Sequence, residues 1–317
     1  MFLPIILIII GLVILIGGAE FLVRGASSIA KRAGISELTI GLTVVAFGTS
    51  MPELVVNMIA AFKGTADIAI GNIVGSNIAN ILLILGISAI IYPLTVKSNT
   101  VWKEIPFAVL AMVLVFVMGN DVFLDGVSFN AITRTDGLVL LAMFAIFMYY
   151  IFGSAKTEGE GEDVKIYTWS ISLIFTAIGL AALFYGGKLL VDNAVIVARV
   201  AGLSEALIGL TVVAVGTSLP ELATSAVAAY RHKNDIAVGN IIGSNIFNVF
   251  WILGLTGTVM QLPFNPAANV DALVALLAVV LLFVFMFIHT RHKINRWQGA
   301  MFVFLYVVYT SYLIMRG

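Results

Sequence analysis

Cysteine is absent from this chain of 317 residues, and charged residues are scarce. Without cysteine there are no disulfides and no thiolate metal sites. Charged residues make up 11% of the chain, against about 25% in soluble domains, while 61% are hydrophobic and the mean hydropathy is +1.10. The formal net charge is zero, which argues against a nucleic-acid partner. We therefore expect a protein that is solvated by the lipid bilayer.

Histidine is almost as scarce. The three histidines, His232, His289 and His292, lie close to Arg or Lys at the ends of apolar segments, so we interpret them as solvated flanks. An intramembrane serine protease would need a histidine well inside such a segment, and an aspartyl protease would need paired aspartates there. The acids well inside the segments are glutamates. We therefore expect neither an enzyme nor a cofactor.

Long apolar runs account for most of the sequence. Runs of roughly 17 to 25 residues can cross a bilayer as helices. Ten are found, at residues 2–23, 38–62, 68–92, 102–119, 137–153, 168–190, 206–230, 236–258, 270–289 and 298–315. The sequence thus predicts an all-α membrane protein with ten transmembrane helices.

The polar segment between the fifth and sixth runs divides the chain. Residues 154–167 are rich in glycine and acid and have no apolar face, so we interpret them as a cytoplasmic acidic linker between a first half, 1–153, and a second half, 168–317. Lys and Arg number twelve in the loops on the linker's side and five on the other side. The positive-inside rule then predicts a cell-membrane protein with both termini extracellular.

A long internal repeat relates the two halves. The stretch GLTVVAFGTSMPELVVN, Gly41–Asn57, returns 168 residues later as GLTVVAVGTSLPELATS, Gly209–Ser225. Residues 34–86 align without a gap onto 202–254, and 32 of the 53 pairs are identical. Five helices per half is an odd number, so the second copy enters the membrane from the opposite side. We therefore predict two inverted-topology repeats of five helices, with ion-binding motifs at 41–86 and 209–254.

Each copy of the motif carries one carboxylate, Glu53 or Glu221, inside an uncharged apolar run. A lone acid at membrane depth is costly and by default marks an ion or proton path. The prolines that precede these acids remove a backbone donor, which frees carbonyls for a ligand. Hydroxyls stand three and four positions earlier in each copy; they belong to Ser50, Thr49, Ser218 and Thr217. A site of oxygens alone suits Ca²⁺ or Na⁺.

A second motif follows in each half. GNIVGSNIAN and GNIIGSNIFN contain the GxxxG spacing that lets helices approach closely, which would bring Ser76 and Ser244 to a central site. Asn80 and Asn248 lie four residues further on, on the same helical face. They fit either interhelical hydrogen bonding or neutral ion ligation, and we favour ligation.

These motifs closely resemble the paired alpha repeats of the calcium/cation antiporter superfamily, in its sodium/calcium exchanger branch. The resemblance implies that Glu53 and Glu221 are the principal Ca²⁺ and Na⁺ ligands, joined around Ca²⁺ by the carbonyls of Thr49 and Thr217. It also implies flanking Na⁺ sites on both sides, formed by Ala46, Thr49, Ser50 and Ser76 and by Ala214, Thr217, Ser218 and Ser244.

Two positions depart from the pattern of that family. Some relatives have aspartate at the position of Asn248, an acid associated with the central site or with K⁺ co-transport. Both halves have asparagine here, so we expect no K⁺ dependence and less charge at the centre. Asn57 stands where the second copy has Ser225, which could alter the ion set.

The resulting functional hypothesis is a monomeric secondary antiporter that exchanges Ca²⁺ for Na⁺ by alternating access. The first and sixth helices would slide past a fixed core. A proton/calcium antiporter with the same glutamate pair is the main alternative. A passive channel is a second alternative, because inverted repeats and broken helices also occur in channels.

Overall fold

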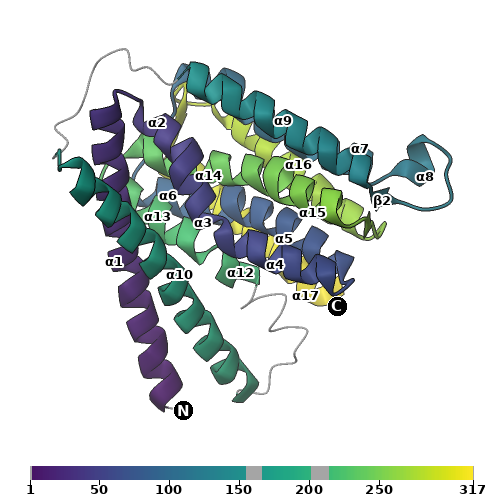
Figure 1. The fold of residues 1–317 in the computed structure, drawn as a ribbon, viewed down its shortest axis with the longest axis horizontal. Coiled ribbons are helices and arrows are strands. Elements are labelled where there is room, and N and C mark those ends of the chain that lie inside the picture. The colour runs from purple at the N-terminus through teal and green to yellow at the C-terminus, as the bar shows by residue number, and fades with distance from the viewer. Residues whose placement is uncertain (1, 155–165, 201–213, 317) are drawn as a thin grey trace.

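The computed structural model describes residues 2–154, 166–200 and 214–316, and this part of the chain is almost entirely helical (Figure 1). The elements of the first half are α1 (Phe2–Ala33), α2 (Glu37–Ile40), the π-helix η1 (Gly41–Val45), α3 (Ala46–Thr49), α4 (Met51–Phe62), α5 (Ala66–Ile78), the π-helix η2 (Ala79–Leu85), α6 (Gly86–Ile91), β1 (Leu94–Thr95), the π-helix η3 (Thr100–Glu104), α7 (Ile105–Met118), α8 (Asp121–Leu124), β2 (Ala131–Ile132) and α9 (Arg134–Gly153).

The second half follows a similar order. Its described elements are α10 (Trp169–Val200), α12 (Ala214–Thr217), α13 (Leu219–Tyr230), α14 (Asn234–Ile246), the π-helix η5 (Phe247–Leu253), α15 (Gly254–Val259), β3 (Leu262–Pro263), α16 (Ala268–Phe285), β4 (Lys293–Ile294) and α17 (Arg296–Arg316). The short strands form two antiparallel pairs, β1 with β4 and β2 with β3, so each pair joins a loop of one half to a loop of the other.

The membrane-spanning character predicted from composition is confirmed. Within the described residues, eight helical runs are long and apolar enough to cross a bilayer. A ninth candidate is the pair Glu37–Thr49 and Met51–Phe62, bent by 45° at Ser50. Most of the predicted linker lies outside the described residues. The predicted run 206–230 also begins outside them, and α12 and α13 are its described part.

The first and sixth helices are longer than predicted. Each has 32 residues, so α1 continues to Ala33 and α10 to Val200 beyond the ends expected from hydropathy. The apolar runs 2–23 and 168–190 mark only part of each helix, because charge does not stop a helix. Arg24 pairs with Glu20 at 2.5 Å, and Lys188 pairs with Asp192 at 3.4 Å. Such i,i+4 pairs support a helix past the end of its apolar run.

These two long helices pack against each other in opposite directions and lie side by side in Figure 1, α1 in purple and α10 in teal. Glycines at the crossing permit a close approach. A Cβ on Gly11 would lie 2.9 Å from the carbonyl oxygen of Gly186, and one on Gly18 would lie 3.0 Å from that of Gly179. Since residue numbers rise along one helix as they fall along the other, the pair is antiparallel.

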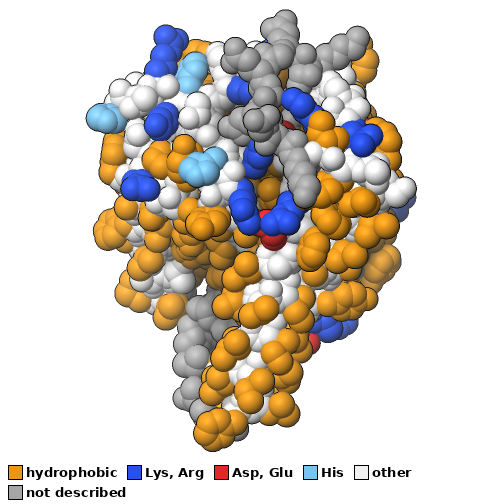
Figure 2. All heavy atoms as spheres, turned by 90° about the vertical axis from the view of Figure 1, so that its left-hand side faces the viewer, with side chains coloured by type: hydrophobic (Ala, Val, Ile, Leu, Met, Phe, Trp, Pro, Cys, Tyr) orange, Lys and Arg blue, Asp and Glu red, His pale blue; other side chains and the backbone are white. Residues whose placement is uncertain are grey.

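The helices that carry the second motif occupy the centre of the protein. In the runs Ala66–Ile91 and Asn234–Val259, 78% and 94% of the most apolar window is buried, against 22% in α1. Outer helices instead expose large apolar side chains, as expected of surfaces that face lipid. Figure 2 shows one such face, largely apolar, with Lys, Arg and His gathered toward its upper end.

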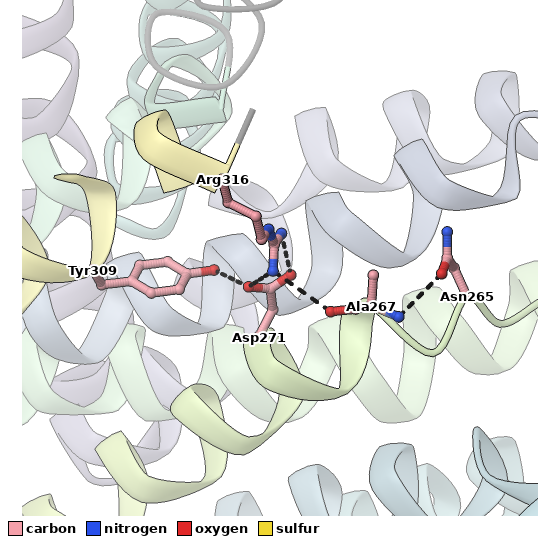
Figure 3. A network of polar contacts seen from close by, with 5 residues as sticks. All are labelled: Asn265, Ala267, Asp271, Tyr309 and Arg316. Carbon is pink, nitrogen blue, oxygen red and sulfur yellow. Dashed lines mark hydrogen bonds and ion pairs between the residues drawn. The ribbon is translucent and has the colours of Figure 1, made fainter. Parts of the chain in front are cut away.

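A charged cluster fixes the end of the C-terminal helix. Figure 3 shows Asp271, from the first turn of α16, facing Tyr309 and Arg316 of α17. The Arg316 guanidinium donates to both carboxylate oxygens of Asp271, at 3.2 and 2.9 Å, and the Tyr309 hydroxyl donates at 3.0 Å. The two-point geometry is the strong form of an arginine–carboxylate pair, so it joins α16 to α17.

Candidate ion-binding site

The two predicted acids lie just past breaks in their helices. Helix α3 ends at Thr49, Ser50 leaves helical geometry with φ −84° and ψ 9°, and α4 begins at once with proline in its first turn. The second copy repeats this at Ser218, with φ −89° and ψ 7°, between α12 and α13. Glu53 and Glu221 therefore fall in the first turns of α4 and α13, where the helix dipole favours a carboxylate.

Each acid is buried and held by a hydroxyl from the other half. Glu53 and Glu221 are both 1% exposed. The Ser50 hydroxyl donates to Oε1 of Glu221 at 2.9 Å, and the Ser218 hydroxyl donates to Oε1 of Glu53 at 3.3 Å. Spacing placed Ser50 on the face of Glu53, in its own half; because the helix breaks at Ser50, the hydroxyl contacts the opposite acid. The two acids thus belong to one site.

The serines of the second motif complete this arrangement. Ser76 lies 3.5 Å from Oε1 of Glu53, and Ser244 lies 3.4 Å from Oε1 of Glu221. All four contacts use the same carboxylate oxygen of each acid. Oε2 of Glu53 and Oε2 of Glu221 are buried with no hydrogen-bond partner among the described atoms. Unpaired buried carboxylate oxygens are costly, so this site is chemically incomplete without a cation or a proton.

The threonine hydroxyls of the two helix breaks bond to asparagines of the second motif. Thr49 donates to Oδ1 of Asn240 at 3.0 Å, and Thr217 donates to Oδ1 of Asn72 at 3.4 Å. Asn240 in turn donates to the carbonyl of Glu221 at 3.4 Å, and Asn72 to that of Glu53 at 3.5 Å. Asn72 and Asn240 were not among the predicted site residues, although their presence in both motif copies was a signal.

Asn80 and Asn248 lie within the π-helical turns η2 and η5. Asn80 donates its amide N–H to Oδ1 of Asn245 at 3.0 Å, and Asn248 donates to Oδ1 of Asn77 at 2.9 Å. The amide oxygens of Asn80 and Asn248 remain buried without a partner among the described atoms. Both alternatives for these residues therefore have structural support, since one end of each amide bonds across helices and the other is free to bind an ion.

The remaining predicted positions lie beside the helix breaks. Ala46 is fully buried, and its carbonyl accepts from the Ser50 N–H at 3.0 Å and the Thr49 hydroxyl at 3.3 Å. Ala214 begins α12. The position that differs between the copies, Asn57, donates to the Glu53 carbonyl at 3.0 Å and keeps a buried, unpartnered Oδ1. Its counterpart Ser225 accepts from Asn240 instead, at 2.9 Å.

The donor set suits a hard cation. No group of three or more His, Cys, Asp or Glu side chains forms a metal cluster in the described part of the chain. At this site, five buried oxygens have no partner among the described atoms, two of carboxylates and three of amides, and they accompany the hydroxyls and the helix breaks. Ca²⁺ takes about six to eight oxygens, and two carboxylates neutralise its charge.

Comparison with known proteins identifies the family. A family model described as "Sodium/calcium exchanger protein" matches residues 3–153 and 171–315. The chain belongs to the sodium/calcium exchanger family. It is 38% identical to the "Putative antiporter CaxA" of Alkalimonas amylolytica, covering 98% of each chain, and 31% identical to the "Sodium/calcium exchanger MaX1" of Methanosarcina acetivorans, covering 96% of each.

Solved structures of another exchanger share the fold. The sodium-calcium exchanger NCX_Mj, soaked with Na⁺ and Sr²⁺, superposes with a TM-score of 0.84 at 36% identity over 97% of each chain. This exchanger family member is thus a membrane transporter and not an enzyme, as expected from the sequence. The resemblance inferred from the two motifs is confirmed.

Proposed function

We propose that this chain is a secondary antiporter that exchanges Ca²⁺ for Na⁺, with Glu53 and Glu221 as ligands for both ions. The observation that carries the proposal is the pair of buried acids, each bonded through Oε1 to a serine of the opposite half and each keeping a free Oε2. The name of MaX1 and the ions soaked into NCX_Mj support the same pair of substrates.

The charge of the site explains why exchange would be obligatory. One Ca²⁺ or two Na⁺ neutralise two carboxylates, and a third Na⁺ would make the cycle electrogenic. An empty site would leave two negative charges buried, and burying an unpaired charge costs several kcal/mol. The occluded state is therefore accessible only when loaded, so an ion crosses in each direction and leak is suppressed.

Ten spans in two inverted repeats of five remain our proposal for the topology. Three observations support it: the antiparallel packing of α1 with α10, the paired contacts in which Ser50 meets Glu221 as Ser218 meets Glu53, and the strand pairs β1–β4 and β2–β3. On this proposal α1 and α10 slide together past the core and open the site to each side in turn.

Transport into vesicles tests the function directly. The purified chain is reconstituted into liposomes loaded with Na⁺ and diluted into Na⁺-free buffer containing ⁴⁵Ca²⁺, beside liposomes loaded with Li⁺ or K⁺. Uptake is expected only with internal Na⁺. Glu53→Gln and Glu221→Gln should each abolish it, because each removes one of the two charges that balance Ca²⁺.

A matched control makes the same substitution at another buried acid. Glu104 is 2% exposed and accepts from the Tyr150 hydroxyl, outside the ion-binding site, so Glu104→Gln should retain uptake. Uptake that persists in both site variants would rule out the two acids as shared ligands. Uptake driven by a pH step without Na⁺ would instead establish the proton-coupled alternative, and single-channel currents would establish a channel.

A further inference from the structure

Four buried asparagines lie where the central helices of the two halves meet. Asn77, Asn80, Asn245 and Asn248 are each 1% exposed. They form two reciprocal pairs, since Asn80 donates to Oδ1 of Asn245 at 3.0 Å and Asn248 donates to Oδ1 of Asn77 at 2.9 Å. In each pair the donor lies in a π-helical turn of one half and the acceptor lies in the last turn of α5 or α14 of the other half.

These bonds decide which end of each amide is left free. A carboxamide has an acceptor oxygen on one side and an NH₂ donor on the other. With the NH₂ of Asn80 bonded to Asn245, the oxygen of Asn80 points elsewhere and is buried without a partner. The oxygen of Asn248 is left free in the same way by Asn77. An amide oxygen attracts a cation, whereas a reversed amide would present positively polarised N–H groups.

Asn80 and Asn248 each follow a serine that contacts one of the acids. Asn80 follows Ser76 by one helical turn, and Ser76 contacts Oε1 of Glu53. Ser244 and Asn248 repeat that relation beside Glu221. Among the described residues, the structure thus leaves the carboxylate oxygens on α4 and α13 and the amide oxygens in η2 and η5 buried and unpartnered.

We infer that Asn245 and Asn77 are positioning residues that hold the amides of Asn80 and Asn248 with their oxygens toward the transported cation. This inference rests on the proposed function, because it names a further determinant of the same site. The energy of an ion in the field of a dipole scales with the charge of the ion, so a reversed amide opposes Ca²⁺ about twice as strongly as Na⁺ at the same distance. The asparagine pairs therefore favour the divalent ion.

Asn245 is the better residue to test. Its side chain makes one hydrogen bond among the described residues, to Asn80, whereas Asn77 also donates to the carbonyl of Asn245 and to Sδ of Met112, both at 3.3 Å. Asn245→Ala removes the acceptor. Asn245→Asp keeps an acceptor oxygen whether it is ionised or protonated, so it serves as the conservative variant.

Equilibrium binding of ⁴⁵Ca²⁺ to the purified full chain, with Na⁺ competition, measures the effect without requiring transport. Asn245→Ala should weaken Ca²⁺ binding about tenfold, the size expected for losing one charge-assisted contact. Na⁺ competition should change less, and Asn245→Asp should restore binding. In an Asn80→Ala background Asn245→Ala should have no further effect, because a residue that acts through Asn80 has nothing left to orient.

A second amide pair provides the control. Asn120 and Asn269 donate to each other at 2.7 and 2.8 Å outside the ion-binding site, so Asn120→Ala should leave Ca²⁺ binding unchanged. Three results would each overturn the inference. They are wild-type Ca²⁺ binding by Asn245→Ala, equal losses of Ca²⁺ binding with alanine and with aspartate at this position, and a further loss when Asn245→Ala is added to Asn80→Ala. Wild-type protein that binds Ca²⁺ but shows no Na⁺-driven uptake would instead refute the proposed exchange.

Discussion

Replacing Gly18 by alanine should separate the two long helices and destabilise the protein. A Cβ at Gly18 would lie 2.8 Å from the Cβ of Ala182 on α10. Carbon atoms in ordinary contact are about 3.5–4.0 Å apart, so α1 and α10 must move apart by ~1 Å. Overpacking of this kind costs about 1–3 kcal/mol. Replacing a helical glycine by alanine also gains about 1 kcal/mol in helix propensity, which offsets part of the loss.

The neighbouring glycine separates these two effects. A Cβ at Gly17 would meet nothing within 4 Å, so Gly17→Ala has the propensity gain without the clash. The difference between the two variants isolates packing, and we expect Gly18→Ala to be less stable by about 1–3 kcal/mol. Thermal unfolding in one detergent, followed by intrinsic fluorescence, measures this difference. Equal unfolding temperatures would show that α1 and α10 are not closely packed at Gly18.

Two further predictions concern contacts between helices. Asp271→Asn should lower stability by about 1 kcal/mol, because it removes the charge that Arg316 contacts at two points, and proteolysis near the C-terminus should become faster. A rate equal to that of the wild type would contradict a joining role for this pair. Because the chain has no cysteine, Glu20→Cys with Arg231→Cys gives a unique pair of thiols on α1 and at the end of α13, where the native side chains form an ion pair of 2.7 Å. A bifunctional thiol reagent should stop exchange there, and undiminished exchange would refute sliding of α1.

The repeat made the central chemistry predictable from sequence. Hydrophobicity alone does not explain identical residues at a fixed offset in two apolar segments. The acids and serines found in this way do meet in the structure. Hydropathy was less informative about the ends of helices. The apolar run ends at residue 23, whereas α1 continues to Ala33 past the Glu20–Arg24 pair.

Side-chain direction was harder to predict than proximity. Helical spacing assumes a continuous helix, but the chain leaves helical geometry at Ser50, which turns its hydroxyl from Glu53 to Glu221. Asn245 was missed for a related reason. The partner of Asn80 comes from the other half, across a π-helical turn, and the spacing within one motif carries no information about contacts between motifs.

The contacts between halves also limit how the protein can move. If the halves rocked against each other at the site, the Ser50–Glu221, Thr49–Asn240 and Asn80–Asn245 bonds would break together with their counterparts. These groups are all buried, and each buried polar group left unpaired would cost about 1–3 kcal/mol. Where α10 meets the core its contacts are instead apolar, as between Leu180 and Gly48 or Val191 and Gly216, and the Glu20–Arg231 ion pair that links α1 to the end of α13 is partly exposed. Movement of the α1–α10 pair past an intact core therefore requires far less free energy than movement within the core.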